Sequence, residues 1–276
     1  MTIKLIALDL DGTTLNKKGK LSLRTREAME RALAKGVNIV IATGRCFDAL
    51  PTEVMDFPGL QYAVTSNGAQ IREIHTGRTL YTNCIDDHAI DAIADTLEDH
   101  DHMMEVFVDG KAYIEKKWYD HVLEGNTVHR SRNYVLRTRR PTEGLMNFMR
   151  GNKASIENIN IFFDIMEEKA AMWEVLVTLK DVTLTSSFDN NWEIGGATTS
   201  KGAAVEALCE KLEIQKGHVM ACGDSPNDES MLRMAGVPVA VGNAKDVIKG
   251  LAVFVSGTNE EDGVAMAIEK FVLQGE

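Results

Sequence analysis

Short apolar runs that alternate with amphipathic helical stretches constrain the fold of this chain more than any other feature. The clearest runs lie at residues 5–10, 37–42, 62–65 and 219–222. Runs that are apolar at nearly every position are typical of strands buried on both faces of a parallel sheet. Between the first two runs, residues 21–36 place apolar side chains on one helical stripe and end at a glycine. Strands alternating with helices predict an α/β fold with a doubly wound, mostly parallel sheet.

The pattern changes near residue 84 and returns near residue 189. In between, a hairpin is predicted around Asp109 and Gly110, followed by helices and strands in mixed order. These strands have the composition of half-exposed strands, which indicates an α+β arrangement. The simplest organisation is a core made of residues 1–83 and 189–276, with residues 84–188 as an inserted domain.

Composition and charge exclude several classes of function. The 276 residues carry a formal net charge of −11, and such an acidic chain repels nucleic-acid phosphates and anionic membrane surfaces. Neither a signal peptide nor an apolar run of membrane-spanning length is present. No pair of cysteines has CxxC spacing, so free thiols in a reducing, cytoplasmic compartment are expected. The four cysteines are Cys46, Cys84, Cys209 and Cys222.

Polar side chains follow the predicted core strands where each strand ends. In a doubly wound sheet, ligands bind beyond the carboxyl ends of the strands. The residues at these ends are Asp9, Asp11, Thr43, Gly44, Arg45, Asn67, Asp224, Asn227 and Asp228. Converging acids repel one another unless a cation lies between them, and oxygen ligands without histidine favour Mg²⁺ over zinc.

Lys201 adds a positive charge at a predicted helix N-terminus, directly after the sequence GGATTS. A lysine beside a helix N-terminus suits a phosphate group. Asp9 is then a candidate nucleophile, because a carboxylate attacks phosphorus to form an aspartyl-phosphate. Asp11, beyond the turn at Gly12, is a candidate acid for the leaving oxygen.

Each of these patterns also has a purely structural interpretation. Two acids separated by one residue also occur on exposed loops, and the segment GDSPND, residues 223–228, suits a helix cap. A lysine in SKG is ordinarily at the surface. A functional site is the favoured interpretation because each of these segments falls at a predicted strand end or helix start. Their order along the chain is one that a single fold brings together.

Taken together, these residues resemble the haloacid dehalogenase superfamily of phosphohydrolases. The four motifs are DLDGTT at 9–14, Thr43 in IATGR, Lys201 in TSKG, and GDSPND at 223–228. Three further segments resemble the Cof-type subfamily: TSNGA at 65–69, AVGNA at 240–244, and EDGVAMAI near the C-terminus. This resemblance implies a Rossmann-like core, and it identifies the middle block as the large α/β cap that this subfamily carries.

The resemblance also implies a role for each matching residue. Asp9 is expected to be the nucleophile and a Mg²⁺ ligand, and Asp11 the general acid and base, which binds Mg²⁺ through its carbonyl. Thr43 and Lys201 are expected to hold the phosphoryl group, and Asp224 to complete the metal ligands.

The remaining implied roles concern support and binding around the phosphate. Asp228 is expected to support the metal ligands, and Asn227 to approach the phosphate or the metal. Gly44, Arg45 and Asn67 are expected beside the phosphate or the leaving group.

The function predicted from these features is a Mg²⁺-dependent phosphatase for small phosphorylated metabolites such as sugar phosphates. A large cap implies a closed cavity, which disfavours folded phosphoproteins as substrates. A hexose phosphomutase would use the same aspartyl-phosphate, and no feature of the sequence separates it from a phosphatase. A phospho-receiver module combines similar residues but is usually about half this length.

Two further clusters are left without a function at this stage. His100 and His102 lie among acids, but their spacing matches no defined metal site, so a polar helix end is the better interpretation. Five arginines form a basic cluster that is expected mainly at the surface, with contact to anionic substrates as the alternative. They are Arg130, Arg132, Arg137, Arg139 and Arg140.

Overall fold

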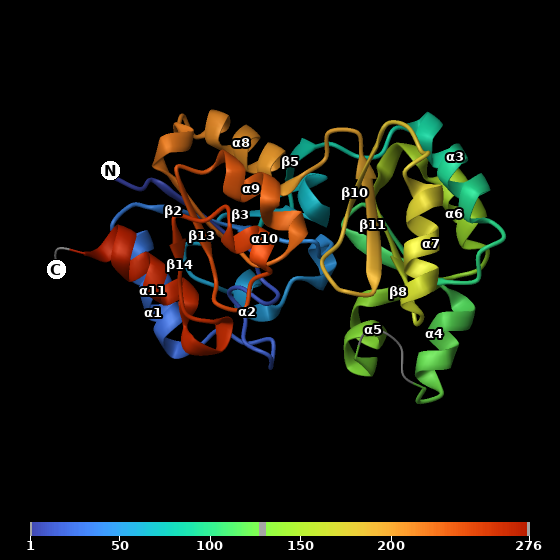
Figure 1. Ribbon diagram of the computed structural model, residues 1–276, viewed down its shortest axis with the longest axis horizontal. Helices are drawn as coiled ribbons and strands as arrows, with labels where there is room; N and C mark the ends of the chain where they lie inside the picture. The colour runs from blue at the N-terminus through green and yellow to red at the C-terminus, as the bar shows by residue number, and fades with distance from the viewer. Residues whose placement is uncertain (1, 127–130, 275–276) are drawn as a thin grey trace. The chain divides into compact units, whose positions relative to one another are not determined.

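The computed structural model describes residues 2–126 and 131–274 and divides into two compact units (Figure 1). The first unit contains Met1–Gly44, Leu50–Tyr81 and Ser200–Glu276, and the second contains Arg45–Ala49 and Thr82–Thr199. The chain therefore leaves the first unit and returns to it. None of the helices in the described part of the chain has the length and apolar character needed to cross a membrane.

The first unit is built on an eight-stranded sheet with the order β14-β13-β12-β1-β2-β3-β4-β5. The strands are β1 (Leu5–Leu8), β2 (Asn38–Ala42), β3 (Tyr62–Thr65), β4 (Gln70–Glu73), β5 (Thr79–Thr82), β12 (Val219–Gly223), β13 (Val237–Ala240) and β14 (Phe254–Val255). The strands from β14 to β3 pair in parallel, and β4 pairs antiparallel with β3. All four residues of β1 are buried, as the apolar runs predict.

Helices flank this sheet on both faces (Figure 1). They are α1 (Leu23–Ala34), α2 (Thr52–Met55), α8 (Lys201–Lys211), α9 (Glu229–Met234), α10 (Asp246–Lys249) and α11 (Gly263–Ile268). Ser22 is the N-cap residue of helix α1, and its hydroxyl accepts a hydrogen bond from the Thr25 amide at 3.0 Å. Helix α1 packs against α11, and α8 packs against α9. This is the doubly wound architecture that the alternation of strands and helices predicts.

The strand order reverses between β1 and β12. From β1 the chain proceeds to β2 and β3 on one side, and from β12 it proceeds to β13 and β14 on the other. In open α/β sheets this switch point leaves a crevice beyond the carboxyl ends of the two strands, where ligands bind. The residues after β1 and β12 are therefore the ones that the fold places for function.

The second unit is α+β, with a six-stranded sheet of order β10-β11-β9-β6-β7-β8. Its strands are β6 (Met103–Val108), β7 (Lys111–Glu115), β8 (Arg139–Thr142), β9 (Ile156–Phe162), β10 (Val182–Thr185) and β11 (Asn191–Gly196). Its helices are α3 (Asp87–Leu97), α4 (Lys116–Leu123), α5 (Arg132–Thr138), α6 (Leu145–Gly151) and α7 (Met166–Leu176). The predicted hairpin joins β6 to β7, and Asp109 and Gly110 both have positive φ, as a tight hairpin turn requires.

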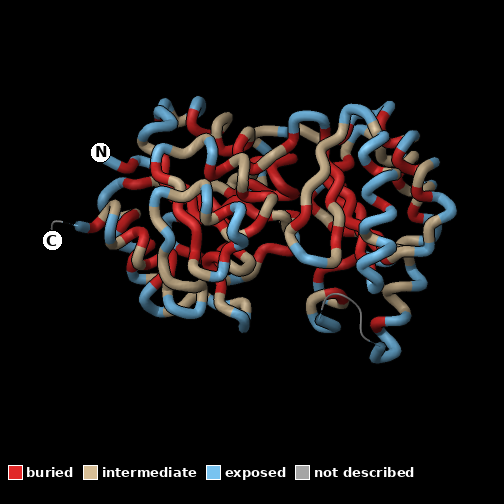
Figure 2. Tube along the Cα trace, in the orientation of Figure 1, coloured by how far each residue is buried: buried red, intermediate tan, exposed pale blue. Residues whose placement is uncertain are grey.

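Side chains alternate across the second sheet as the pleat of a strand requires. Met104, Val106 and Val108 of β6 join the apolar core under α3, α6 and α7. Met103 faces the other way and packs with Trp118 of α4. The central strands of both units are the buried segments of Figure 2.

The arginine cluster is only partly at the surface. Arg132, Arg137 and Arg140 are exposed, but Arg139 is buried and forms two hydrogen bonds with Glu105, at 2.6 and 2.7 Å. The surface expectation is therefore wrong for Arg139, because a buried carboxylate from β6 supplies its partner. Arg130 lies outside the described residues.

Candidate active site

Asp9 lies directly after β1, where the sheet reverses direction. Its amide donates a hydrogen bond to the carbonyl of Cys222 on β12, at 3.1 Å, so the strand pairing extends to this residue. The hydroxyl of Thr14 donates to the Asp9 carbonyl at 2.5 Å. Asp9 itself is 5% exposed. The backbone of Asp9 is therefore held at the switch point by β12 and by the Thr14 hydroxyl.

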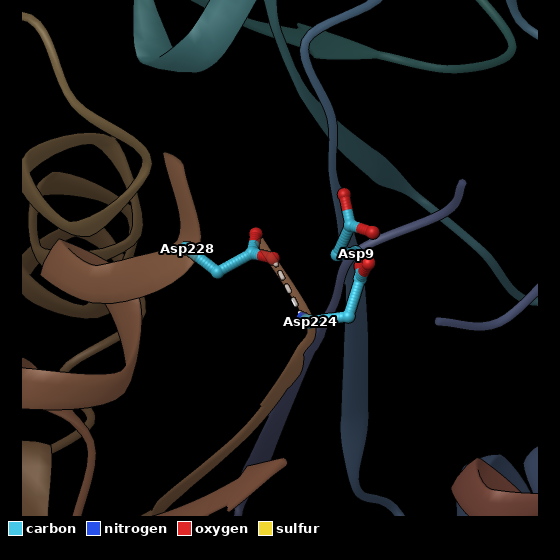
Figure 3. Close-up of side chains that lie close together, drawn as sticks. All are labelled: Asp9, Asp224 and Asp228. Atoms are coloured by element: carbon cyan, nitrogen blue, oxygen red, sulfur yellow. Dashed lines mark hydrogen bonds between the residues drawn. The ribbon is translucent and has the colours of Figure 1, made fainter. Parts of the chain in front are cut away.

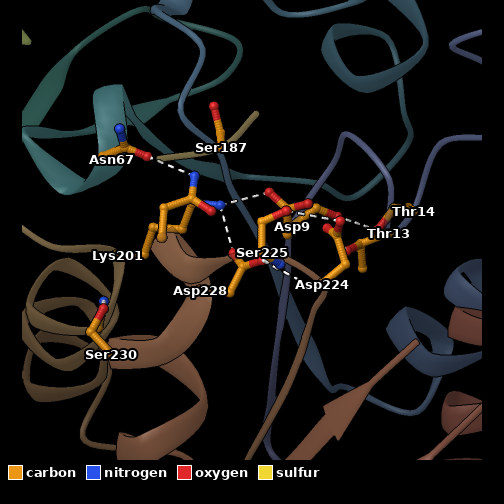
Figure 4. Close-up of polar contacts among 12 residues, drawn as sticks. Asp9, Thr13, Thr14, Asn67, Ser187, Lys201, Asp224, Ser225, Asp228 and Ser230 are labelled. Carbon is orange, nitrogen blue, oxygen red and sulfur yellow. Dashed lines mark hydrogen bonds and ion pairs between the residues drawn. The ribbon is translucent and has the colours of Figure 1, made fainter. Parts of the chain in front are cut away.

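Lys201 is the first residue of α8 and is fully buried. Its ammonium nitrogen donates to Oδ1 of Asp9 at 2.6 Å and to Oδ1 of Asp228 at 2.7 Å (Figure 4). Because a buried charge is stable only when it is paired, the two carboxylates explain why this lysine is inside the protein. They also raise the pKa of Lys201 above its usual value, against the effect of burial, so its positive charge persists.

Asp228 organises the loop after β12. Its Oδ2 accepts hydrogen bonds from the amides of Asp224 and Ser225, at 2.9 and 3.0 Å, in a reciprocal capping box with Ser225. Gly223 makes room for this carboxylate, because a Cβ there would lie 2.5 Å from Cβ of Asp228. The helix-cap interpretation of GDSPND is therefore realised, and the same residue also contacts Lys201.

Asp224 is held by two hydroxyl groups. Thr13 donates to Oδ1 at 2.8 Å and Ser225 donates to Oδ2 at 2.9 Å. Gly12, with φ of +85°, reverses the chain within the motif at residues 9–14. A Cβ at Gly12 would lie 2.7 Å from Asp224 Oδ2. Only glycine combines this backbone conformation with so close an approach.

The carboxylates of Asp9, Asp224 and Asp228 lie close together (Figure 3). Each offers an oxygen within 4.8 Å of the others, and within the described residues no other group of three or more His, Cys, Asp or Glu side chains meets this criterion. Burial, and then repulsion from Asp228, raise the pKa of Asp9 well above its usual range, and Lys201 opposes them. The same two causes raise the pKa of Asp224.

These observations fit a divalent cation. Three carboxylates and one lysine leave an excess of negative charge, which a cation between Asp9 and Asp224 would offset. Both oxygens of Asp228 already accept hydrogen bonds from the protein, so Asp228 is suited to positioning its neighbours. A set of oxygen donors without histidine or thiolate is typical of hard cations such as Mg²⁺.

The ends of β2 and β3 add a second set of polar groups. Thr43 is buried, and its carbonyl accepts a hydrogen bond from the Asn67 amide at 3.1 Å. Oδ1 of Asn67 accepts from the Asn227 side chain at 3.0 Å, which joins this set to the loop after β12. A Cβ on Gly44 would lie 3.0 Å from Asn67 Oδ1, so glycine gives Asn67 its space.

The turn after β3 has an uncommon backbone. Ser66 and Asn67 have φ of 51° and 56°, and Gly68 has φ of 102°. Non-glycine residues in this region are strained, and such strain is concentrated at functional sites. A Cβ on Gly68 would lie 2.1 Å from the carbonyl oxygen of Ser200, the residue before Lys201. The turn and the start of α8 are thus in tight contact.

Asp11 and Arg45 are the remaining predicted site residues. Asp11 is half-buried, and its backbone pairs with Leu15 in an isolated bridge within the loop that Gly12 reverses. Arg45 belongs to the second unit, where its guanidinium donates to the Ala49 carbonyl at 3.0 Å and lies 5.2 Å from the ring centre of Tyr134.

Three supporting residues were missed by sequence reasoning. Thr13 and Ser225 hold Asp224, and Asn243 donates to the carbonyl of Gly12 at 2.8 Å and accepts from the Asn259 amide at 2.9 Å. The signal for the first two is that both are short hydroxyl residues within the acidic motifs at 9–14 and 223–228. Asn243 lies in AVGNA, a segment that marked the subfamily without indicating a contact.

Comparison with known proteins gives the same family. The family described as haloacid dehalogenase-like hydrolase matches residues 6–268. Phosphatase YwpJ of Bacillus subtilis is 32% identical over 281 residues, which is 95% of this chain and 98% of that protein. The 5-amino-6-(5-phospho-D-ribitylamino)uracil phosphatase YcsE of the same organism is 31% identical, over 98% of this chain and 96% of that protein.

A solved structure of a haloacid dehalogenase-like hydrolase from B. subtilis is also similar. It superimposes with a TM-score of 0.83 at 30% identity, over 98% of this chain and 100% of that chain. The match includes the inserted unit as well as the core, which confirms the predicted fold class. The protein is therefore a member of the haloacid dehalogenase-like hydrolase family, of the Cof type that its motifs predict, and an enzyme of the phosphoric monoester hydrolase class.

Proposed function

We propose that this protein is a Mg²⁺-dependent, cytoplasmic phosphatase that hydrolyses small phosphorylated metabolites through an aspartyl-phosphate on Asp9. The observation that carries the proposal is the bridge from Lys201 to Asp9 and Asp228 beside Asp224. In this bridge a carboxylate, a persistent positive charge and two further acids lie together at the switch point of the sheet, which supports Asp9 as the nucleophile.

The first step transfers the phosphoryl group to the enzyme. A carboxylate oxygen of Asp9 forms a bond to phosphorus, while the bond from phosphorus to the ester oxygen breaks. Asp11 gives its proton to that oxygen, so the substrate leaves as a neutral alcohol. Lys201 and Thr43 stabilise the charge on the transferring group. Bound at Asp9 and Asp224, Mg²⁺ would supply charge neutralisation for the phosphoryl oxygens.

The second step returns the enzyme to its starting state. The Asp11 carboxylate takes a proton from water, and the water oxygen bonds to phosphorus. The bond between phosphorus and the Asp9 oxygen breaks, inorganic phosphate leaves, and Asp9 is again a carboxylate. In this scheme Asn67 and Asn227 lie beside the phosphate, with Gly44 allowing close approach. Arg45 is assigned to the leaving group.

The names of two relatives support a substrate class. Two of them, at 31% and 32% identity, are named 5-amino-6-(5-phospho-D-ribitylamino)uracil phosphatases, and that name describes a phosphate on a polyhydroxylated ribityl chain. This supports phosphorylated sugars and sugar alcohols as substrates.

The proposal is tested by phosphate release from p-nitrophenyl phosphate and a panel of sugar and sugar-alcohol phosphates, with Mg²⁺ or with chelator. Release is expected only with Mg²⁺ and only from enzyme with Asp9 intact. Quenching in acid and reducing with borohydride should convert the aspartyl-phosphate at position 9 to homoserine, detectable by mass spectrometry.

Asp11→Asn is the informative variant in this experiment. With p-nitrophenyl phosphate, whose leaving group departs without a proton, Asp11→Asn should accumulate the phosphorylated enzyme, because water activation is lost while Asp9 remains. Asp9→Asn should show neither intermediate nor release. Full release in chelator, or from Asp9→Asn, would refute the mechanism. Isomerisation of a hexose phosphate without net release would identify a phosphomutase instead.

A further inference from the structure

Asp11, the proposed acid and base, lies in a turn formed by residues 11–15. Gly12 follows Asp11 in the chain, and Leu15 pairs with Asp11 across the turn in an isolated bridge. The amide of Leu15 also donates to the carbonyl of Leu10, at 2.9 Å, which closes the turn. The backbone position of Asp11 therefore depends on Gly12 on one side and on Leu15 on the other.

Two asparagines from other loops hold these two positions. The side-chain amide of Asn243, after β13, donates to the carbonyl of Gly12 at 2.8 Å. The side-chain amide of Asn259, after β14, donates to the carbonyl of Leu15 at 2.8 Å. The asparagines are themselves joined, because the backbone amide of Asn259 donates to Oδ1 of Asn243 at 2.9 Å. One connected set of hydrogen bonds thus holds both sides of the turn that carries Asp11.

The partners of Asn243 explain why this residue is an asparagine. The Gly12 carbonyl can only accept a hydrogen bond and the Asn259 backbone amide can only donate one, so Nδ2 faces Gly12 and Oδ1 faces Asn259. An ionised aspartate has the same shape but no donor. It would keep the hydrogen bond from Asn259 and lose the one to Gly12, so the turn depends on an amide at this position.

The loop that carries Asn243 is itself held in place. The amide of Lys245 donates to the backbone carbonyl of Asp224 at 3.0 Å. On the other side, a Cβ at Gly242 would lie 2.9 Å from the backbone nitrogen of Thr258, so this loop and the segment after β14 are in tight contact. A side chain on such a held backbone can fix the position of its partner, as the groups around a catalytic residue must do.

The contacts of the two asparagines contribute more to position than to stability. Asn243 is exposed and Asn259 is half-buried, and at such positions water replaces a lost hydrogen bond at little cost. Water does not fix the orientation of the turn, however. A general acid must lie within hydrogen-bond reach of the oxygen that it protonates, and a small displacement lowers the rate.

We propose that Asn243 and Asn259 are positioning residues for Asp11. By holding the carbonyls of Gly12 and Leu15, their side-chain amides set the position from which the Asp11 carboxyl gives its proton to the ester oxygen as the bond from phosphorus to that oxygen breaks. This inference rests on the proposed function, because it assumes that Asp11 is the general acid. Neither asparagine is assigned a contact with the substrate.

The test compares two classes of ester in Asn243→Asp and Asn259→Asp, which keep the shape of each side chain and remove its donor. The readout is kcat/KM, which covers the steps up to phosphoryl transfer and excludes the later hydrolysis of the aspartyl-phosphate. For the sugar-alcohol phosphate that the unmodified enzyme hydrolyses best, kcat/KM should fall about tenfold in each variant. For p-nitrophenyl phosphate, whose leaving group departs without a proton, it should fall less than about twofold.

Asn38→Asp is the matched control. The side chain of Asn38 also donates to a backbone carbonyl, that of Lys4 at 3.3 Å, but it lies where β2 begins, at the opposite edge of the sheet from the candidate active site. This substitution should change kcat/KM for neither ester. Thermal melting checks that each variant is folded.

Hydrogen–deuterium exchange supplies a readout that does not depend on activity. The amides of residues 10–16 should exchange about threefold faster in Asn243→Asp and Asn259→Asp, because the turn opens more often when a carbonyl is released, and should be unchanged in Asn38→Asp. Unchanged exchange in both turn variants would overturn the proposal.

The kinetic outcomes separate this proposal from the function on which it rests. An equal fall in kcat/KM for both esters would overturn the positioning of Asp11, since the loss would then lie in phosphoryl transfer to Asp9. Unchanged values for both esters would overturn it as well. No phosphate release from the unmodified enzyme would refute the proposed function and with it the role of Asp11, while the exchange measurement would still decide whether the two asparagines hold the turn.

Discussion

The side chains of Lys201 and Asp9 are 0% and 7% exposed and are joined by a hydrogen bond of 2.6 Å. This buried pair connects the start of α8 to the end of β1, two points 192 residues apart in the chain. Asp228 shares the same ammonium group. The arrangement joins the first and last parts of the first unit at the one place where the chemistry is proposed to occur.

Removing the charge of Lys201 should destabilise the protein strongly. Lys201→Met leaves two buried carboxylates without their cation, and breaking such a pair from one side costs about 3–5 kcal/mol of unfolding free energy. The measurement is urea unfolding at pH 7 in chelator.

Asp9→Asn is the matched comparison, and it should raise the unfolding free energy that Lys201→Met lowers. Because the pKa of Asp9 is raised in the folded state, its ionised form at pH 7 opposes folding when no metal is present, and an uncharged amide removes that cost. An equal loss of stability in both variants would contradict this account. Both variants should lack phosphatase activity.

Gly68 should be irreplaceable for steric reasons. Gly68→Ala combines a positive φ with a Cβ 2.1 Å from the Ser200 carbonyl, and the expected loss is about 2–4 kcal/mol. Gly36→Ala is the control, since φ there is +78° but nothing lies within 4 Å, and it should cost about 1 kcal/mol. The two are compared by thermal unfolding and kcat. Only Gly68→Ala should also lower kcat, because Ser200 adjoins Lys201; equal costs would contradict the clash.

Removing one partner of the buried ion pair in the second unit should cost more stability than removing one partner of a neighbouring surface pair. Arg139→Met removes the guanidinium from the buried Glu105 carboxylate, at a cost of about 3–5 kcal/mol, whereas Glu105→Met with Arg139→Met should restore most of the stability. Arg140→Met, which removes an exposed pair with Asp48, should cost less than about 1 kcal/mol. Chemical denaturation followed by tryptophan fluorescence reports on this unit, because Trp118, Trp173 and Trp192 all lie in it. A double variant as unstable as Arg139→Met would refute the pairing argument.

Much of the first unit could be predicted because its strands are continuous apolar runs. Strands β1, β2, β3 and β12 all follow from that pattern, and the end of each strand places a candidate residue at one edge of the sheet. Strands β4 and β5 were missed, because short half-polar segments do not differ from loops in composition. The roles assigned to all of the candidate site residues, and the domain boundaries at 84 and 188, stay predictions.

What the sequence could not indicate depends on long-range partners. Arg139 belongs to an arginine-rich segment typical of a surface, and its burial follows from Glu105, a residue 34 positions away. Likewise, the contact between Asn243 and the carbonyl of Gly12 joins residues 231 positions apart. A pattern of residue types indicates which side chains are stable in contact with solvent. It does not show which distant group provides the hydrogen bonds of a polar group that is buried.

His102 and His88 should give opposite dependences of stability on pH. Burial lowers the pKa of His102 below 6.5, so the unfolded chain binds the proton more readily, and this group costs stability as pH falls below 6.5. His88 donates or accepts at 3.0 Å with Asp181, which raises its pKa above 6.5. The contribution of His88 to stability is therefore complete below pH 6.5. It is lost as pH rises through the pKa that His88 has in the folded state.

Urea unfolding at a series of pH values from 5 to 8, an interval of about the histidine titration range, measures both effects. His102→Gln should reduce the loss of stability on the acid side, and His88→Gln should slightly increase it, because His88 is at the surface where solvent weakens its ion pair. If His102→Gln keeps the slope of the unmodified protein, then burial of His102 is not what opposes its protonation. The imidazole packs 4.8 Å from the ring of Phe163 with 18% of its side chain exposed, so the desolvation that drives the effect has a defined structural origin.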